Sequence, residues 1–206
     1  MLISCRNQRP LSQSLLNSNQ QTVTHSHDRD KKSVSIGDSI LQGVQKRGLT
    51  PNVDVYTLPG ARVRDVFLKE KSNDLSNWEW CIIYVGGNDA ADQCVLKSCY
   101  DELWVMINYI RTRFACKTSV CSACHRTDTN VVPINDMLRQ LCENNNVDLI
   151  DTYSPFIYGD GERARYYYYR DGIHLNKAGS SRLVTTFDKH ASVTKRSRGA
   201  ASQDTC

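Results

Sequence analysis

The amino-acid sequence predicts an α/β domain, a three-layer α/β/α sandwich built around a five-stranded parallel sheet. The chain has 206 residues, a length typical of one domain with tails. Hydrophobic residues make up 40% of it and charged residues 23%, so it has enough apolar material for a core. Short apolar runs alternate with helical patterns, and this alternation is typical of a parallel sheet that helices cover on both faces.

Five short runs are candidates for the strands, because each is rich in β-branched or apolar residues. They span residues 33–36, 53–56, 81–85, 118–122 and 147–150. The longest helical pattern covers residues 92–114. Its apolar positions recur at spacings of three and four, as on one face of a helix: Val95, Cys99, Leu103, Ile107, Ile110 and Phe114. Further helices are predicted to begin near Ile40, to span 132–143, and to follow Asn176, a suitable N-cap residue.

The two ends of the chain have a different composition from the segment between them. Residues 1–32 are polar and without periodicity, and we predict that they and residues 191–206 are disordered tails around a domain at 33–190. The net charge of +4 lies in these ends, because 1–32 carries +3 and 191–206 carries +2, which leaves −1 for the domain. Nucleic acid is therefore a weakly supported partner, attracted through the basic tails alone.

Membrane and secretory segments are not expected. The longest strongly apolar run, residues 81–85, is far shorter than the roughly 20 residues of a membrane-spanning helix. The N-terminus lacks the apolar stretch of a secretory signal, so we expect an intracellular protein. The nine cysteines are an odd number, and in that compartment they are predicted to be free thiols.

A candidate nucleophile follows the first predicted strand, in the sequence Gly37-Asp38-Ser39. Glycine permits a tight turn from strand to helix. Ser39 would then lie at a helix N-terminus, where backbone N–H groups and the helix dipole stabilise a developing oxyanion. The same tripeptide is also a common turn and helix cap, so alone it does not identify an active site.

Hydrogen-bond donors and a possible base follow at the same edge of the predicted sheet. The Gly60 backbone N–H follows the second strand and the Asn88 side-chain amide follows the third, which is the convergence that an oxyanion hole needs. Near the end of the chain, Asp171 precedes His174 by three residues. A carboxylate at that spacing can reach the imidazole within one turn and hold its tautomer. Each of these pieces alone is also compatible with an ordinary turn.

Together these blocks, in the order Ser, Gly, Asn, then Asp and His, resemble the SGNH hydrolases, also called the GDSL-type esterase and lipase superfamily. The resemblance covers roughly residues 33–190 and implies a flavodoxin-like sheet. It also implies Ser39 as nucleophile, His174 as general base and Asp171 as its partner. Ser39 N–H, Gly60 and Asn88 would form the oxyanion hole. Thr127-Asp128 with residues 135–138, together with residues 171–176, also resemble the small esterase-like domains of some non-LTR retrotransposon proteins.

The resemblance implies a serine esterase that acts on small-molecule esters and needs neither a metal nor an organic cofactor. Asp89 is closely followed by the long predicted helix, which leaves no room for a large lid and predicts a preference for short acyl groups such as acetyl. The alternative is a non-catalytic interaction module of a mobile-element or nucleic-acid-associated protein. The basic ends favour that alternative, whereas a complete set of triad residues argues against it.

Two other patterns receive less weight. The segment 121–125, Cys-Ser-Ala-Cys-His, matches a c-type haem attachment pattern, but it coincides with the fourth strand. As a zinc site, Cys121, Cys124 and His125 lack the paired spacing of structural zinc ligands. The four tyrosines at 166–169 precede the Asp-His segment and are compatible with a substrate pocket or with packing that supports this loop.

Overall fold

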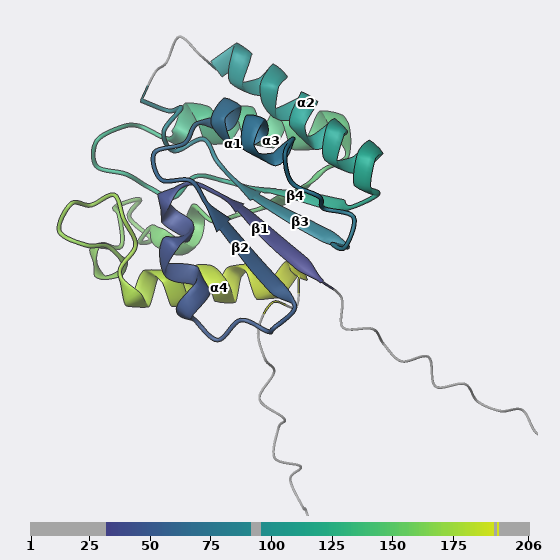
Figure 1. Ribbon diagram of the computed structural model, residues 1–206. Helices are drawn as coiled ribbons and strands as arrows, with labels where there is room; N and C mark the ends of the chain where they lie inside the picture. The colour runs from purple at the N-terminus through teal and green to yellow at the C-terminus, as the bar shows by residue number, and fades with distance from the viewer. Residues whose placement is uncertain (1–31, 92–95, 192, 194–206) are drawn as a thin grey trace, which may run out of the picture.

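The computed structural model describes residues 32–91, 96–191 and 193, and it contains the predicted parallel sheet (Figure 1). Its five strands are β1 (Ser33–Gly37), β2 (Val53–Thr57), β3 (Trp80–Tyr84), β4 (Lys117–Cys121) and β5 (Asp148–Ile150). All pairs are parallel, in the order β2-β1-β3-β4-β5. Each predicted strand is confirmed to within one residue at either end, because the buried apolar runs that define the strands fill the interior of the domain.

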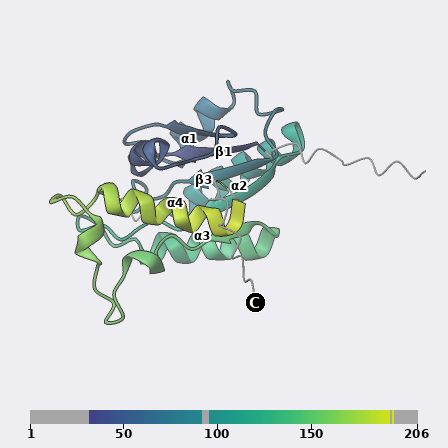
Figure 2. The same ribbon diagram turned by 90° about the horizontal axis from the view of Figure 1, so that it is seen from below.

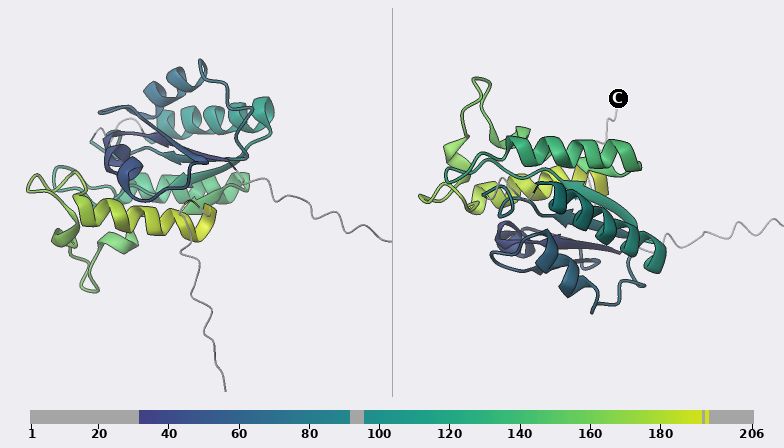
Figure 3. Two further views of the ribbon diagram at one scale, coloured as in Figure 1. Left: turned by 60° about the horizontal axis from the view of Figure 1, so that its bottom comes forward. Right: turned by 90° about the horizontal axis from the view of Figure 1, so that it is seen from above.

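Helices cover both faces of the sheet, which confirms the three-layer architecture. α1 (Val63–Glu70), α2 (Leu96–Phe114) and α3 (Val132–Asn145) lie on one face (Figure 3, right). The short helix η1 (Ser39–Lys46) and α4 (Lys177–Ala191) lie on the other, and α4 runs across the sheet when the molecule is seen from below (Figure 2). Two further turns of 3₁₀ helix, η3 (Ser154–Phe156) and η4 (Arg165–Tyr167), lie between β5 and α4.

Apolar residues of the sheet separate into two clusters, one under each helical layer. Val34, Ile36 and Ile83 pack toward α1, α2 and α3, whereas Ile82 and Tyr84 face η1 and α4. This alternation follows from the period of two along a strand. Both faces of β1 and β3 are therefore buried, as expected for the central strands of a doubly covered sheet.

The helices differ from their sequence predictions in detail. η1 is a 3₁₀ helix, and α3 extends two residues beyond the predicted 143. Residues 92–95, the predicted start of the long helix, lie outside the described part of the chain. The predicted tails lie mostly outside it as well. However, Val193 is buried and its carbonyl accepts a hydrogen bond from Thr50 N–H at 2.9 Å, so the described fold extends beyond residue 190.

The strand order places a topological switch point between β1 and β3. β1 connects to β2 on one side, and the chain then crosses to β3 on the other, so the loops after β1 and β3 diverge from adjacent strands. In open parallel sheets, ligands bind at such a switch point, outside the carboxyl ends of the strands. Gly37, the last residue of β1, pairs there with Thr57 and Tyr84. Among the described residues, no helix is both long and apolar enough to cross a membrane.

Candidate active site

Ser39 lies directly after the carboxyl end of β1, as the first residue of η1. The turn before it requires glycine, because a Cβ on Gly37 would lie 2.1 Å from the Tyr84 carbonyl oxygen. The Asp38 carboxylate caps η1 by accepting a hydrogen bond from Ile40 N–H at 2.9 Å. The half-buried Ser39 side chain is thereby held at the sheet edge by backbone geometry.

His174 and Asp171 lie beside Ser39, although 135 positions separate the serine from the histidine in the chain. Ser39 Oγ is 3.1 Å from His174 Nε2, and His174 Nδ1 is 2.8 Å from Asp171 Oδ2. The contacts are consistent with the predicted roles of a nucleophile, a base and a carboxylate that orients the base. The imidazole and the carboxylate are each over 40% exposed, so the pair lies open to solvent.

Asp171 is stabilised in its charged form. Its Oδ1 accepts hydrogen bonds from the backbone N–H groups of Ile173 at 2.9 Å and His174 at 3.0 Å. These bonds, that of Ile173 foremost, together with the bond to the His174 ring lower the Asp171 pKa to about 2. The carboxylate is therefore ionised throughout the neutral range, and it favours the tautomer of His174 that carries its proton on Nδ1.

Contacts with neighbouring segments hold the loop that carries Asp171 and His174. Gly172 has a φ of +70°, and a Cβ there would lie 2.3 Å from Arg163 Nη1 and 2.6 Å from Thr127 Oγ1. The Thr127 hydroxyl donates to the Asp171 carbonyl at 3.0 Å. Asn176 then caps α4, as predicted, by accepting hydrogen bonds from the N–H groups at 178 and 179. The loop geometry thus depends on backbone contacts as well as on the side chains of Asp171 and His174.

Gly60 and Asn88, the predicted oxyanion donors, lie in the loops after β2 and β3. Gly60 has a φ of +74°, a conformation that favours glycine. The Asn88 amide donates from Nδ2 to the Ala61 carbonyl at 2.9 Å, which joins the two loops. An amide nitrogen carries two hydrogens, so one remains for another acceptor. Among the described residues, no hydrogen bond links Gly60 or Asn88 directly to Ser39.

The profile of the GDSL-like Lipase/Acylhydrolase family matches residues 35–182. The chain belongs to this family. The match confirms the predicted relationship to the SGNH hydrolases, and it spans the blocks that contain Ser39, Gly60, Asn88, Asp171 and His174. No curated protein sequence matches the chain.

Several solved structures of lipases and esterases share its fold. A lipase/acylhydrolase from Enterococcus faecalis has a TM-score of 0.62 at 16% identity, covering 77% of this chain and 94% of that one. A GDSL-like lipase from Bacteroides thetaiotaomicron has a TM-score of 0.66 at 15% identity, covering 79% and 88%. An acetyl xylan esterase from Geobacillus stearothermophilus has a TM-score of 0.61 at 15% identity, covering 81% and 96%. At these identities the likeness concerns the fold.

Arg126 is a residue of this GDSL-like site that the sequence analysis missed. Its Nη1 donates to Asn88 Oδ1 at 2.9 Å, and its Nε and Nη2 donate to the two oxygens of Asp128 at 2.9 and 2.7 Å. The Asn88 amide is thus held at both ends, by Arg126 at its oxygen and by the Ala61 carbonyl at its nitrogen. The only sequence signal is an arginine shortly after β4, because its partner lies 38 positions away.

Asp38 is the buried carboxylate of the GDSL-like motif. It is 1% exposed, and its Oδ2 has no hydrogen-bond partner among the described residues. Burial raises its pKa to about 6, while the bond from Ile40 N–H and the charge of Arg126 oppose this shift. Since one pKa unit corresponds to about 1.4 kcal/mol, ionised Asp38 lowers the stability of the folded protein by up to about 3 kcal/mol.

Asp38→Asn is therefore expected to stabilise the protein at neutral pH. A raised pKa means that the folded state holds this proton more tightly, so wild-type stability falls as pH rises from about 4 to about 6 and stays lower above that. Urea unfolding at pH 4 and pH 7.5 tests this. The stability gained by the variant should be larger at pH 7.5, by up to about 3 kcal/mol. An equal gain at both values would contradict the prediction.

The cysteines and tyrosines have mainly packing roles where the structure describes them. Six cysteines are free and buried, in agreement with the prediction of thiols: Cys81, Cys99, Cys116, Cys121, Cys124 and Cys142. Cys5, Cys94 and Cys206 lie outside the described residues. Tyr168 is buried and packs with Tyr167 on the Phe156 ring, which agrees with a supporting role for the tyrosine run. Tyr169 is exposed and lines the pocket beside Ser39.

Proposed function

We propose that this protein is a serine esterase that hydrolyses carboxylic esters with short acyl groups through an acyl-serine intermediate. The observation that supports this most directly is the chain of contacts from Ser39 Oγ through His174 to Asp171, with distances of 3.1 and 2.8 Å. Membership of the GDSL-like Lipase/Acylhydrolase family is consistent with this chemistry. The substrate partner would be a small-molecule ester.

In the proposed reaction, Ser39 Oγ attacks the ester carbonyl carbon while His174 Nε2 takes the hydroxyl proton. The bond to the alcohol oxygen then breaks, and His174 returns the proton to the leaving alcohol. Water attacks the acyl-serine in the same manner and releases the carboxylic acid. Asp171 stays ionised and stabilises the imidazolium. Besides the substrate and water, these steps use only side chains and backbone groups of this chain.

The tetrahedral oxyanion would be held by Ser39 N–H, Gly60 N–H and the second Nδ2 hydrogen of Asn88. Neither backbone N–H donates to an acceptor among the described residues, which leaves both free to bind the oxyanion. Donors fixed before the reaction stabilise developing charge without a reorganisation cost. The Arg126 and Ala61 contacts would supply this preorganisation for Asn88.

A series of p-nitrophenyl esters, from acetate to laurate, tests the proposed function. We expect kcat/KM to be highest for acetate or propionate and to fall with chain length, because the sequence leaves no room for a large lid after Asp89 and the His174 and Asp171 side chains lie open to solvent. A rate that rises steadily with acyl length would contradict the short-acyl preference. The absence of hydrolysis for the whole series, on folded protein, would contradict the esterase assignment and favour the interaction module.

Asn88→Ala is expected to lower kcat by about 100- to 1,000-fold without unfolding the protein, the usual cost of removing one oxyanion donor. Steady-state hydrolysis of p-nitrophenyl acetate measures it, with thermal unfolding as the check on folding. A loss confined to KM would contradict a role in stabilising the transition state.

Arg126→Ala tests whether Arg126 acts through the Asn88 amide. Because Arg126 contacts Asn88 Oδ1, we expect the substitution to lower kcat by about tenfold in the wild type. In the Asn88→Ala background the same substitution should have little further effect, since the amide that Arg126 positions is already gone. Losses that multiply fully in the double variant would indicate that Arg126 acts independently of Asn88.

A further inference from the structure

A pocket of about 470 Å³ lies beside the Ser39 and His174 side chains. Its walls come from η1, from the loop at 169–176 and from the first turn of α4, and most of the side chains on them are polar or charged. An acetyl group would occupy a small part of such a volume. The remaining space therefore suits the alcohol part of an ester, and the chemistry of the walls indicates which alcohols would bind.

Arg47, at the carboxyl end of η1, is one of two cations on these walls. Its side chain is half-buried, and its Nε is buried without a hydrogen-bond partner among the described residues. Among the same residues, Arg47 forms no ion pair with a carboxylate. A guanidinium has several donors in a planar fork, which matches two oxygens of a carboxylate or a phosphate.

Lys177, the first residue of α4, is the second cation. Its side chain is exposed, and it forms no ion pair in the described part of the chain. A lysine in the first turn of a helix is electrostatically unfavourable, because the N-terminus carries the positive end of the helix dipole. Lys177 therefore does not stabilise α4, and its presence at this position needs another explanation.

The one acidic side chain on the walls of this pocket is already engaged by other donors. Asp171 is the acidic side chain on the walls, and both of its oxygens accept hydrogen bonds, from His174 Nδ1 and from the backbone N–H groups of Ile173 and His174. Two cations and a helix N-terminus thus face a space whose one carboxylate is bound by other donors. The field in the pocket favours an anion.

We propose that this pocket is an anion subsite for the alcohol part of the substrate. The ester would carry a carboxylate or phosphate group, which Arg47 binds through its fork of donors and Lys177 as a point charge. The inference rests on the proposed function, because it assigns the substrate class of the same serine esterase. It predicts a preference among esters that share one acyl group and differ in the charge of the alcohol.

Three aryl acetates test this preference with the full chain: neutral methyl para-acetoxybenzoate, para-acetoxybenzoate and para-acetoxyphenyl phosphate. After division by the uncatalysed rates, wild-type kcat/KM should be about 10- to 100-fold higher for the anionic esters, the range expected of a charge-assisted hydrogen bond. Arg47→Gln should remove most of this preference, and Lys177→Gln a smaller part. The larger of the two anionic rates would identify a carboxylate or a phosphate as the natural group.

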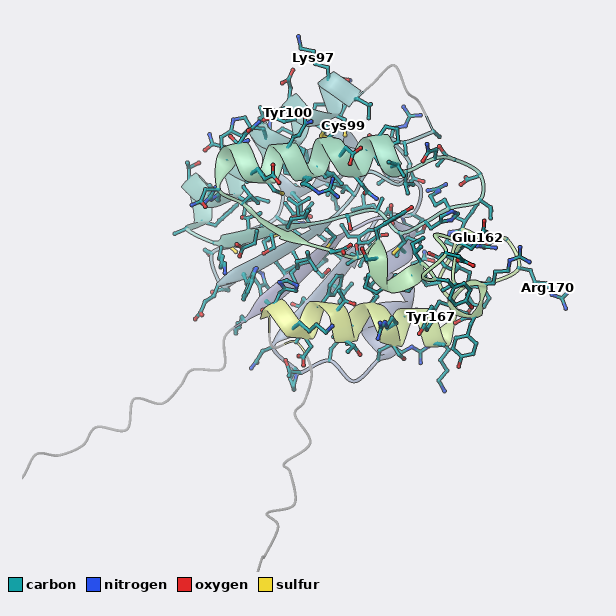
Figure 4. All side chains as sticks on the ribbon, turned by 180° about the vertical axis from the view of Figure 1, so that it is seen from behind. Lys97, Cys99, Tyr100, Glu162, Tyr167 and Arg170 are labelled. Carbon is teal, nitrogen blue, oxygen red and sulfur yellow. The ribbon has the colours of Figure 1, made fainter. Side chains whose placement is uncertain are left out.

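Arg170→Gln is the matched control. Arg170 directly precedes Asp171, but its exposed side chain points away from the body of the protein (Figure 4). The substitution removes the same charge from the chain, and the preference for anionic esters should persist in it. Equal normalised rates for the neutral and anionic esters in the wild type would overturn the subsite. A preference that survives Arg47→Gln on folded protein would overturn it as well.

A binding measurement separates this inference from the proposed function. Benzoate and phenyl phosphate should raise the thermal unfolding temperature of Ser39→Ala, and the rise should be lost when Arg47→Gln is added. Binding without ester hydrolysis by the wild type would support the anion subsite and contradict the esterase. Hydrolysis without charge preference or Arg47-dependent binding would support the esterase and overturn the subsite.

Discussion

Replacing Ser39 with alanine is expected to lower kcat for p-nitrophenyl acetate by about 10⁴- to 10⁶-fold, the loss typical of removing a triad nucleophile. The reason is geometric, because Ser39 Oγ is the atom that faces His174 Nε2 at 3.1 Å. A fluorophosphonate probe gives the same test without a substrate assumption. Intact-mass analysis should show one adduct on the wild type, peptide mapping should place it on Ser39, and Ser39→Ala should lack it.

Ser72→Ala is the control for this prediction. Ser72 is exposed and its hydroxyl donates to the Lys69 carbonyl, and among the described residues no imidazole contacts it that could act as a base. This variant should keep both the adduct and the activity. An adduct that persists in Ser39→Ala, or a folded wild-type protein that forms none, would show that Ser39 is not an activated nucleophile. The non-catalytic interaction module would then be the better explanation of the chain.

The strands of the sheet could be predicted closely from the sequence, because the pattern that identifies each strand lies within a few consecutive residues. Each central strand is a short run whose two faces are both buried, and such runs are recognisable without knowing their neighbours. The type of η1 could not be predicted. An eight-residue segment does not reveal whether its hydrogen bonds span three or four residues, and η1 packs so closely on α4 that a Cβ on Gly43 would lie 2.2 Å from Ser180 Oγ.

The candidate site also contains residues that could be predicted from the sequence and residues that could not. Ser39, Asn88 and His174 each follow a turn with a recognisable composition, so motif order is enough to nominate them. Arg126 and Arg47 have no such local signal. Arg126 matters because folding brings it to Asn88 Oδ1, and Arg47 because folding buries its Nε beside the pocket. Both depend on contacts between loops of different strands and helices, which one sequence does not disclose.

Asp171→Asn is the second substitution with a large expected effect, a fall in kcat of about 10⁴-fold with the fold retained. Asparagine keeps an oxygen that can accept from the N–H groups of Ile173 and His174, so the loop should keep its shape. Its amide nitrogen would take the place of Oδ2 opposite His174 Nδ1. An amide nitrogen donates a hydrogen bond, whereas the carboxylate oxygen accepts one. The imidazole proton would move to Nε2, the nitrogen that must accept the proton of Ser39.

Hydrolysis measured from pH 6 to pH 9 tests this explanation, because the Asp171 pKa of about 2 keeps the wild-type carboxylate ionised throughout that range. The loss in Asp171→Asn should therefore persist at every pH in it. Asp160→Asn is the control, since Asp160 also accepts a backbone N–H bond, from Glu162 at 2.9 Å, but contacts no imidazole. A loss below tenfold in Asp171→Asn would show that the carboxylate does not set the tautomer of His174. The base would then be oriented by the backbone of the loop alone, and Ser39 would depend on His174 without a triad.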